Sequence, residues 1–101
     1  MKIRTSELTG AALDWAVAKA IGEYKPMAVP HYSTDWALGG PIIEREKISL
    51  LALNKGWWRA EIYNDKPCPV YVRDLTPLIA AMRFYVASKL GYEVEIPKEL
   101  I

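Results

Sequence analysis

Apolar positions recur with helical spacing between residues 9 and 21. One face of that helix collects Leu13, Ala16, Val17, Ala20 and Ile21, whereas Asp14 and Lys19 lie off it. Thr9 is placed to cap the helix with its hydroxyl, and Leu8 and Leu13 can pack across that cap. Gly22 tolerates the left-handed backbone that commonly ends a helix. This pattern predicts a helix over residues 10–21.

A second helical pattern covers residues 77–90. Thr76 precedes Pro77, whose fixed φ and missing N–H suit the first helical position, and Gly91 follows the last turn. One broad face carries Leu78, Ile79, Met82, Tyr85, Val86 and Leu90. Arg83 and Lys89 are expected toward the edge of that face or toward solvent.

The middle of the chain reads as a β-hairpin. Residues 47–53 and 57–63 are rich in β-forming types, and the three residues between them end in Gly56, where a left-handed bulge residue is needed. Alternation puts Ile48, Leu50 and Ala52 on one face and Ser49, Leu51 and Leu53 on the other. Residues 2–4 and 93–96 are short alternating segments that could add edge strands to this sheet.

Both faces of the hairpin carry large apolar groups, including the adjacent Trp57 and Trp58. Either helices cover both sides of the sheet or one face meets another subunit. We therefore predict the α+β class. The expected architecture is a small α/β/α sandwich with a central antiparallel hairpin-based sheet and two main helices, over residues 10–21 and 77–90.

Composition narrows the protein class. The chain has 101 residues, 51% of them hydrophobic, which predicts a single domain over residues 1–101. The net charge of +1 argues against charge-driven binding of nucleic acid. We expect neither a membrane-spanning helix nor a signal peptide, because no apolar run approaches about 18 residues. The single cysteine, Cys68, excludes an internal disulfide.

Hydrogen-bonding and aromatic side chains concentrate between residues 31 and 40. Aromatic faces for stacking, polar acceptors and two adjacent glycines suit a small polar ligand. The candidate ligand-binding residues are Tyr32, Ser33, Thr34, Asp35, Trp36, Gly39 and Gly40. The structural alternatives are that Ser33, Thr34 or Asp35 caps a short helix, and that Gly40 caps a helix starting at Pro41.

Catalytic and metal chemistry have weaker support. His31 lies four residues before Asp35, so a carboxylate-oriented general base is one interpretation and a surface or capping histidine is the other. Cys68 lies between two prolines, and nothing in the sequence brings it to His31. No zinc-ligand spacing occurs. We assign no catalytic residue, metal or cofactor, and an enzyme ranks behind the two binding functions below.

Three long segments carry a resemblance to a known family. They are KIRTSELTGAALDWAVAKA at residues 2–20, YSTDWALGGPIIERE at 32–46 and TPLIAAMRFYVASKLGYEVEIPKEL at 76–100. The chain resembles the NinX-like family of small tailed-phage proteins and, more distantly, phage domains described as an ABA sandwich. This resemblance implies an accessory protein that acts in the infected bacterial cytoplasm, and it implies no reaction.

Two functions follow from these patterns. The first is binding of a small polar or nucleotide-like ligand without turnover, through the cluster between Tyr32 and Gly40. The second is a protein–protein interaction module that docks on a host or phage protein, or on a second copy of itself, through Trp57 and Tyr63.

Overall fold

A computed structural model describes residues 1–22, 29–62 and 72–101 of the chain. Within them lie the helices α1 (Gly10–Ile21), α2 (Trp36–Glu46) and α3 (Pro77–Leu90). The strands are β1 (Lys2–Arg4), β2 (Ile48–Ala52), β3 (Trp58–Ile62), β4 (Val72–Asp74) and β5 (Glu93–Glu95). The predicted α+β class and both main helices are confirmed, whereas α2 is longer than the short helix considered around Trp36.

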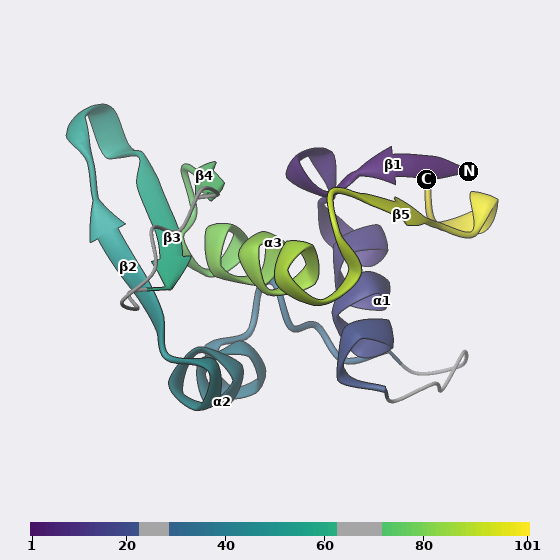
Figure 1. The fold of residues 1–101 in the computed structure, drawn as a ribbon, viewed down its shortest axis with the longest axis horizontal. Helices are drawn as coiled ribbons and strands as arrows, with labels where there is room; N and C mark the ends of the chain where they lie inside the picture. Colours follow the sequence, from purple (N-terminus) through teal and green to yellow (C-terminus); the bar gives the residue numbers. More distant parts are fainter. Residues whose placement is uncertain (23–28, 63–71) are drawn as a thin grey trace.

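Helix α3 occupies the centre of the molecule, between the sheet of β2, β3 and β4 and helix α1 (Figure 1). Its buried residues are Leu78, Ala80, Ala81, Met82, Phe84, Tyr85 and Val86. They surround the helix axis, so the prediction of one apolar face was too narrow. A helix packed on several sides needs apolar side chains all round.

Of the two places predicted for Arg83, the edge of the apolar face or solvent, the structure shows the edge. The Arg83 side chain is 13% exposed. Nε donates to the carbonyl oxygen of Leu8 at 2.6 Å, and Nη1 donates to Asp74 Oδ1 at 2.9 Å. The guanidinium thus joins α3 to the chain before α1 and to β4, satisfying polar groups at the margin of the core.

The hairpin prediction is confirmed and extended by one strand. Strand β3 pairs antiparallel with β2, with Leu50 opposite Ala60, and antiparallel with β4, with Ala60 opposite Val72. Gly56 has the expected positive φ of 82° in the connecting loop. The sequence does not predict strand β4, because three residues are too few for a periodic signal.

Strands β1 and β5 pair with each other, antiparallel, in a separate two-stranded sheet. The expectation that they extend the hairpin sheet is therefore wrong. Thr5 explains part of this pairing, since its N–H donates to the Tyr92 carbonyl at 2.7 Å and its hydroxyl to the Gly91 carbonyl at 2.6 Å. Both chain ends consequently lie beside α1, away from β2 (Figure 1).

The hairpin has a covered face and an open face among the described residues. Ile48, Ala60 and Val72 are buried against the core. On the other face, Leu51 is 43% exposed and Trp57 is 42% exposed. Of the two explanations for an apolar outer face, contact with another subunit therefore stays a prediction.

Helix α2 begins after Asp35, whose Oδ1 accepts a hydrogen bond from the N–H of Ala37 at 2.9 Å. This confirms the capping interpretation of Asp35. Gly39, Gly40 and Pro41 all lie inside α2, so the predicted turn or helix start at these residues is wrong. Gly39 is needed for packing instead.

The other caps are partly as predicted. Gly22 ends α1 in the left-handed conformation, with a φ of 91°. Thr9 and Thr76 occupy the positions before α1 and α3, but neither side chain makes a capping hydrogen bond. The predicted capping by the Thr9 hydroxyl is therefore wrong.

Replacing Gly39 should destabilise the protein, whereas replacing its neighbour should not. A Cβ at Gly39 would lie 2.6 Å from Leu78 Cδ1 and 2.6 Å from the Tyr32 carbonyl oxygen, while one at Gly40 meets nothing within 4 Å. Gly39→Ala should lower the free energy of unfolding by about 1–3 kcal/mol. Gly40→Ala should raise it by about 1 kcal/mol through helix propensity. Urea titration of both variants tests this, and equal stabilities would contradict it.

The ion pair between Glu46 of α2 and Lys89 of α3 should make stability depend on pH. Glu46 Oε1 lies 3.0 Å from Lys89 Nζ. The hydrogen bond from Lys89 holds the pKa of Glu46 below its ordinary value of 4.5. Because the folded pKa is lowered, this stabilisation is present above pH 4.5 and is lost as the pH falls through the folded pKa.

Lys89→Met should therefore reduce the acid-induced loss of stability, and the pKa of Glu46, followed by NMR, should rise. Lys98→Met is the matched control, because the pKa of Glu46 is lowered by Lys89 and Arg45 and not by Lys98. An unchanged pKa of Glu46 in Lys89→Met would contradict the prediction.

Candidate functional site

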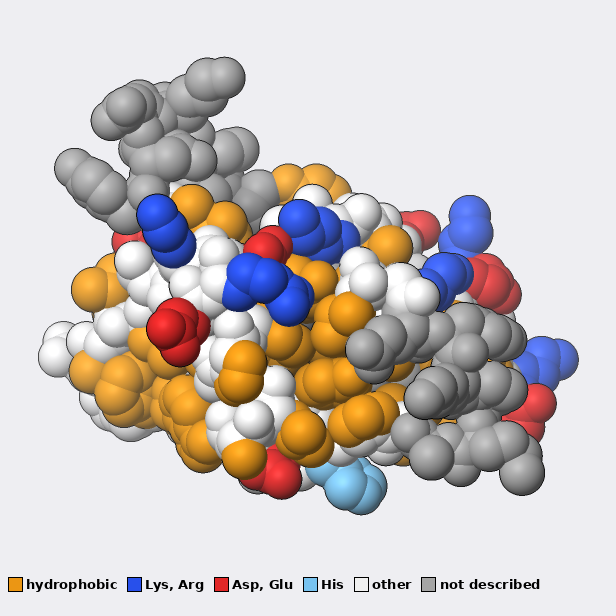
Figure 2. Space-filling view, turned by 90° about the horizontal axis from the view of Figure 1, so that it is seen from below, with side chains coloured by type: hydrophobic (Ala, Val, Ile, Leu, Met, Phe, Trp, Pro, Cys, Tyr) orange, Lys and Arg blue, Asp and Glu red, His pale blue; other side chains and the backbone are white. Residues whose placement is uncertain are grey.

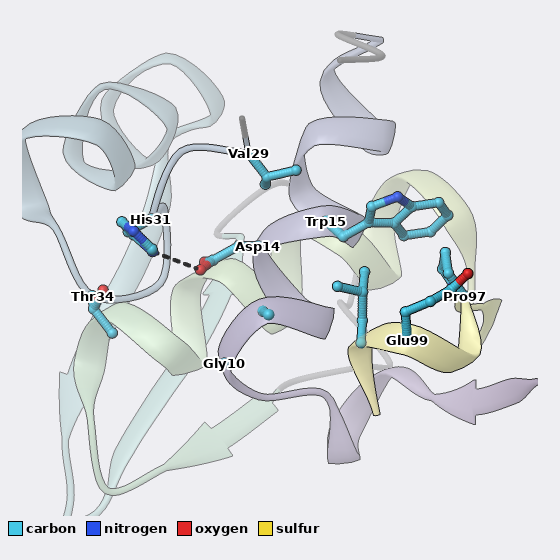
Figure 3. A pocket seen from close by; sticks show the side chains of 10 residues that line it. Gly10, Asp14, Trp15, Val29, His31, Thr34, Pro97 and Glu99 are labelled. Atoms are coloured by element: carbon cyan, nitrogen blue, oxygen red, sulfur yellow. Dashed lines mark ion pairs between the residues drawn. The ribbon is translucent and has the colours of Figure 1, made fainter. Parts of the chain in front are cut away.

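A pocket of about 540 Å³ lies between α1, the segment before α2 and the C-terminal end of the chain (Figure 3). Helix α1 contributes Gly10, Ala11, Asp14 and Trp15. Val29, His31 and Thr34 come from the segment before α2, and Pro97, Glu99 and Leu100 come from the C-terminal turn. Three segments distant in the sequence therefore build one concave site.

Asp14 is the buried polar group of this pocket, with only 4% of the residue exposed. Its Oδ1 accepts a hydrogen bond from the backbone N–H of Ser33 at 2.8 Å. Its Oδ2 lies 3.6 Å from His31 Nδ1. The carboxylate is thus held in place by a backbone donor, and its second oxygen remains near the pocket.

His31 lies at the rim of the pocket. Its side chain is 81% exposed, and the histidine projects from the molecular surface in Figure 2. The carboxylate beside it belongs to Asp14 and not to Asp35, which caps α2. The predicted pairing of His31 with Asp35 is therefore wrong, because the helix that Asp35 begins directs its carboxylate to Ala37.

Trp15 supplies an aromatic wall at the other end of the pocket (Figure 3). The ammonium group of Lys19 lies 5.3 Å from the centre of the Trp15 ring, a cation–π contact. A second, shallower hollow of about 410 Å³ shares Trp15 and Glu99 with the first and is also lined by Lys19 and Lys98. A site with acceptor oxygens thus adjoins a groove that carries two lysines.

The residues predicted to bind a ligand separate in the structure. Thr34 lines the pocket. The backbone N–H of Ser33 donates the hydrogen bond that holds Asp14 in place. Tyr32 is buried in the core at 6% exposure, and Trp36 is 52% exposed on α2. Asp35, as described above, caps α2.

The two glycines of the predicted cluster do not reach this pocket either. Gly39 packs against Leu78 of α3, and Gly40 lies beside it in α2 with open space above its Cα. Neither lines the pocket. Two further candidates, Tyr63 and Cys68, lie outside the described residues.

The residues that matter most in this pocket carried little signal in the sequence. The sequence marks Asp14 only as a polar residue off the apolar face of its helix, and it does not single out Glu99. The one local clue was a charged residue in the middle of an otherwise apolar helical segment. The contact from Asp14 to Ser33 spans 19 residues, which no local pattern reveals.

Metal binding finds no support in the described part of the chain. Over residues 1–22, 29–62 and 72–101, no three His, Cys, Asp or Glu side chains gather where they could hold a metal ion. In the same residues, no helix has the length and apolar character needed to cross a membrane.

Comparison with known proteins identifies a family. Residues 4–89 match the family model described as Bacteriophage P22, NinX. The match spans most of the chain, which therefore belongs to this phage protein family and confirms the resemblance noted in the sequence. None of the curated proteins matches the chain. The family description contains no reaction, ligand or partner.

Asp14 should stabilise the fold mainly through the hydrogen bond that it accepts from the Ser33 N–H, and less through its contact with His31. Asp14→Ala leaves the buried Ser33 N–H without an acceptor and should lower the free energy of unfolding by about 2 kcal/mol. Asp14→Asn keeps an acceptor oxygen and should cost less. His31→Ala removes only the 3.6 Å contact between Asp14 and a side chain that is 81% exposed, and it should cost less than about 1 kcal/mol. Chemical denaturation compares them, and a larger loss in His31→Ala than in Asp14→Ala would contradict the assignment.

Proposed function

We propose that this member of the P22 NinX family binds a small polar, nucleotide-like ligand without converting it. The ligand's planar ring would lie in the pocket between Trp15 and His31, with ring N–H groups donating to Asp14. A phosphate group would lie toward Lys19 and Lys98 in the adjoining groove. The observation that carries this proposal is the buried, pre-positioned carboxylate in a pocket with an aromatic wall.

The size and chemistry of the pocket support a small ligand. Its volume of about 540 Å³ falls in the range of about 300–1,000 Å³ that is usual for ligand sites. Asp14 and Glu99 are acceptors when ionised, so they favour a ligand end rich in N–H donors. A nucleobase presents such donors at its edge and a flat face for stacking on an indole.

The lysines support the phosphate end. Lys19 and Lys98 line the smaller hollow, whereas the described residues that line the larger pocket include no Lys or Arg. A nucleotide that spans both hollows would therefore direct its base and its phosphate to separate, chemically suited regions. Glu99 borders both hollows and Glu95 lines the smaller one, so the phosphate would have to lie nearer the two lysines than these carboxylates.

Binding without turnover fits the arrangement better than catalysis. His31, the candidate for a general base, is 81% exposed and is therefore poorly placed to act on a ligand held inside the pocket. The carboxylate of Asp14 already accepts a backbone hydrogen bond, which suits a fixed recognition group. A phage protein with such a pocket would sequester a host metabolite or signal in the infected bacterial cytoplasm.

Native mass spectrometry of protein purified gently from cells tests whether a ligand is present. A discrete extra mass of a few hundred daltons, removed by unfolding, is the expected result. Thermal denaturation with added guanosine, adenosine and their monophosphates then tests the base and phosphate regions separately. The monophosphates should raise the melting temperature more than the nucleosides do, and added salt should reduce that difference.

Variants assign the two ends of the ligand. Asp14→Asn should weaken binding of nucleoside and monophosphate alike by about tenfold or more, since it removes a charged acceptor. Lys98→Ala should weaken only the monophosphate. Trp36→Ala, on the exposed face of α2, is the matched control and should bind normally. If Trp36→Ala loses binding and Asp14→Asn retains it, the ligand binds at the surface around Trp36 and not in this pocket.

A further inference from the structure

Strand β2 forms one edge of the three-stranded sheet, in the order β2, β3, β4, and lies at the margin of the molecule (Figure 1). Its sequence is Ile-Ser-Leu-Leu-Ala, with no charged residue and no proline. Soluble proteins usually protect an edge strand with charges, proline or a cover, because its unpaired backbone groups can pair with another chain. Strand β2 lacks the first two protections, and no described strand pairs with its outer edge.

The hydrogen bonding of the hairpin shows which backbone groups of β2 face outward. The N–H of Leu53 donates to the Trp57 carbonyl at 2.8 Å, so Leu53 directs its backbone groups toward β3. Orientation alternates along an antiparallel strand, so Leu51 and Ser49 also face β3. The N–H and C=O groups of Ile48, Leu50 and Ala52 consequently point to the open edge.

We propose that a second copy of this chain pairs with that edge, β2 against β2, antiparallel about a two-fold axis at Leu50. The three outward-facing residues are symmetric about Leu50. Ile48 would therefore lie opposite Ala52 of the second copy, and Leu50 opposite its own equivalent. Each of these pairs exchanges two hydrogen bonds, about six in all, and the result is a continuous six-stranded sheet.

The side chains suit a second copy of the same chain. In this register Ser49 lies opposite Leu51 of the second copy, so no like charges meet between the two paired strands. Leu51 is 43% exposed in the single chain. In the dimer, the second copy's strand would cover part of its side chain. The outer faces of the two copies would lie side by side on one face of the joined sheet. Each of them contains Leu51, Leu53 and Trp57.

This pairing is independent of the ligand pocket. Strand β2 lies at the opposite end of the molecule from the C-terminal turn that lines the pocket (Figure 1). Ligand binding and pairing can therefore succeed or fail separately. The proposal concerns self-association alone, so a monomeric chain that captures an unrelated protein would not satisfy it.

Light scattering coupled to size-exclusion chromatography, over a range of concentrations of the full chain, measures the association. The expected mass is twice 11.4 kDa, with dissociation on dilution. A chain that stays monomeric at every concentration overturns the proposal.

Two matched double variants test the register. Ser49→Lys with Leu51→Lys places lysines directly opposite each other across the axis and should raise the dissociation constant about tenfold or more. Ser49→Lys with Leu51→Glu places opposite charges there and should retain the dimer. Within one chain, Ser49 pairs with Glu61 and Leu51 with Arg59, so this second variant is also compatible with the hairpin.

Circular dichroism confirms that both variants fold before their masses are compared. A dimer that persists in the first variant overturns the proposed interface, since it would then form through another surface. A dimer lost equally in both variants overturns the proposed register, because opposite charges at the paired positions should preserve it. If only the first variant dissociates, the result supports both the proposed interface and the proposed register.

Discussion

The burial of α3 on all sides is the constraint on which the rest of the structure depends. A helix with Leu78, Ala80 and Val86 fully buried must be covered by several partners, because these residues lie on different sides of it, and α1, α2 and the three-stranded sheet supply that cover. Close approach is possible at α2 because Gly39 has no side chain to keep it from Leu78. Arg83 remains acceptable in α3 only because Leu8 and Asp74 satisfy its guanidinium.

The candidate site forms where the segment before α2 and the C-terminal turn are held close to α1. The hydrogen bond from the Ser33 N–H to Asp14 holds the segment before α2 against α1. The same bond orients the carboxylate that faces the pocket, so one contact stabilises the fold and would also position the acceptor for the proposed ligand. Pairing of β1 with β5 then brings the C-terminal turn, with Glu99, to the opposite wall. A NinX-family chain can thereby build a concave site from segments at both of its ends.

The two ends of the molecule differ in the chemistry they present. The end near α1 has a hollow with acceptor oxygens, an indole and neighbouring lysines. The end at β2 has an uncharged strand edge and an outer face on which Leu51 and Trp57 lie beside the charged Arg59, Glu61 and Arg73. Because α3 separates the two ends, a substitution at one end need not disturb the other.

The sequence by itself determined the local elements. Periodicity and end signals located α1 and α3, and the loop ending at Gly56 located the hairpin, because these depend on contacts within one element. The sequence also identified the family, because its long motifs can be recognised without knowledge of the structure. The sequence did not locate Strand β4, the interior position of Gly39 or the all-round burial of α3.

Only the tertiary structure decided which residues share the candidate site. Thr34 was predicted for a site and does line the pocket, whereas Asp35 became a helix cap and Tyr32 part of the core. Asp14 gained its role from a backbone N–H 19 residues away. The physical reason is that helix propensity and strand alternation act between neighbours in the chain, while burial and long-range hydrogen bonds depend on which segments the fold brings together.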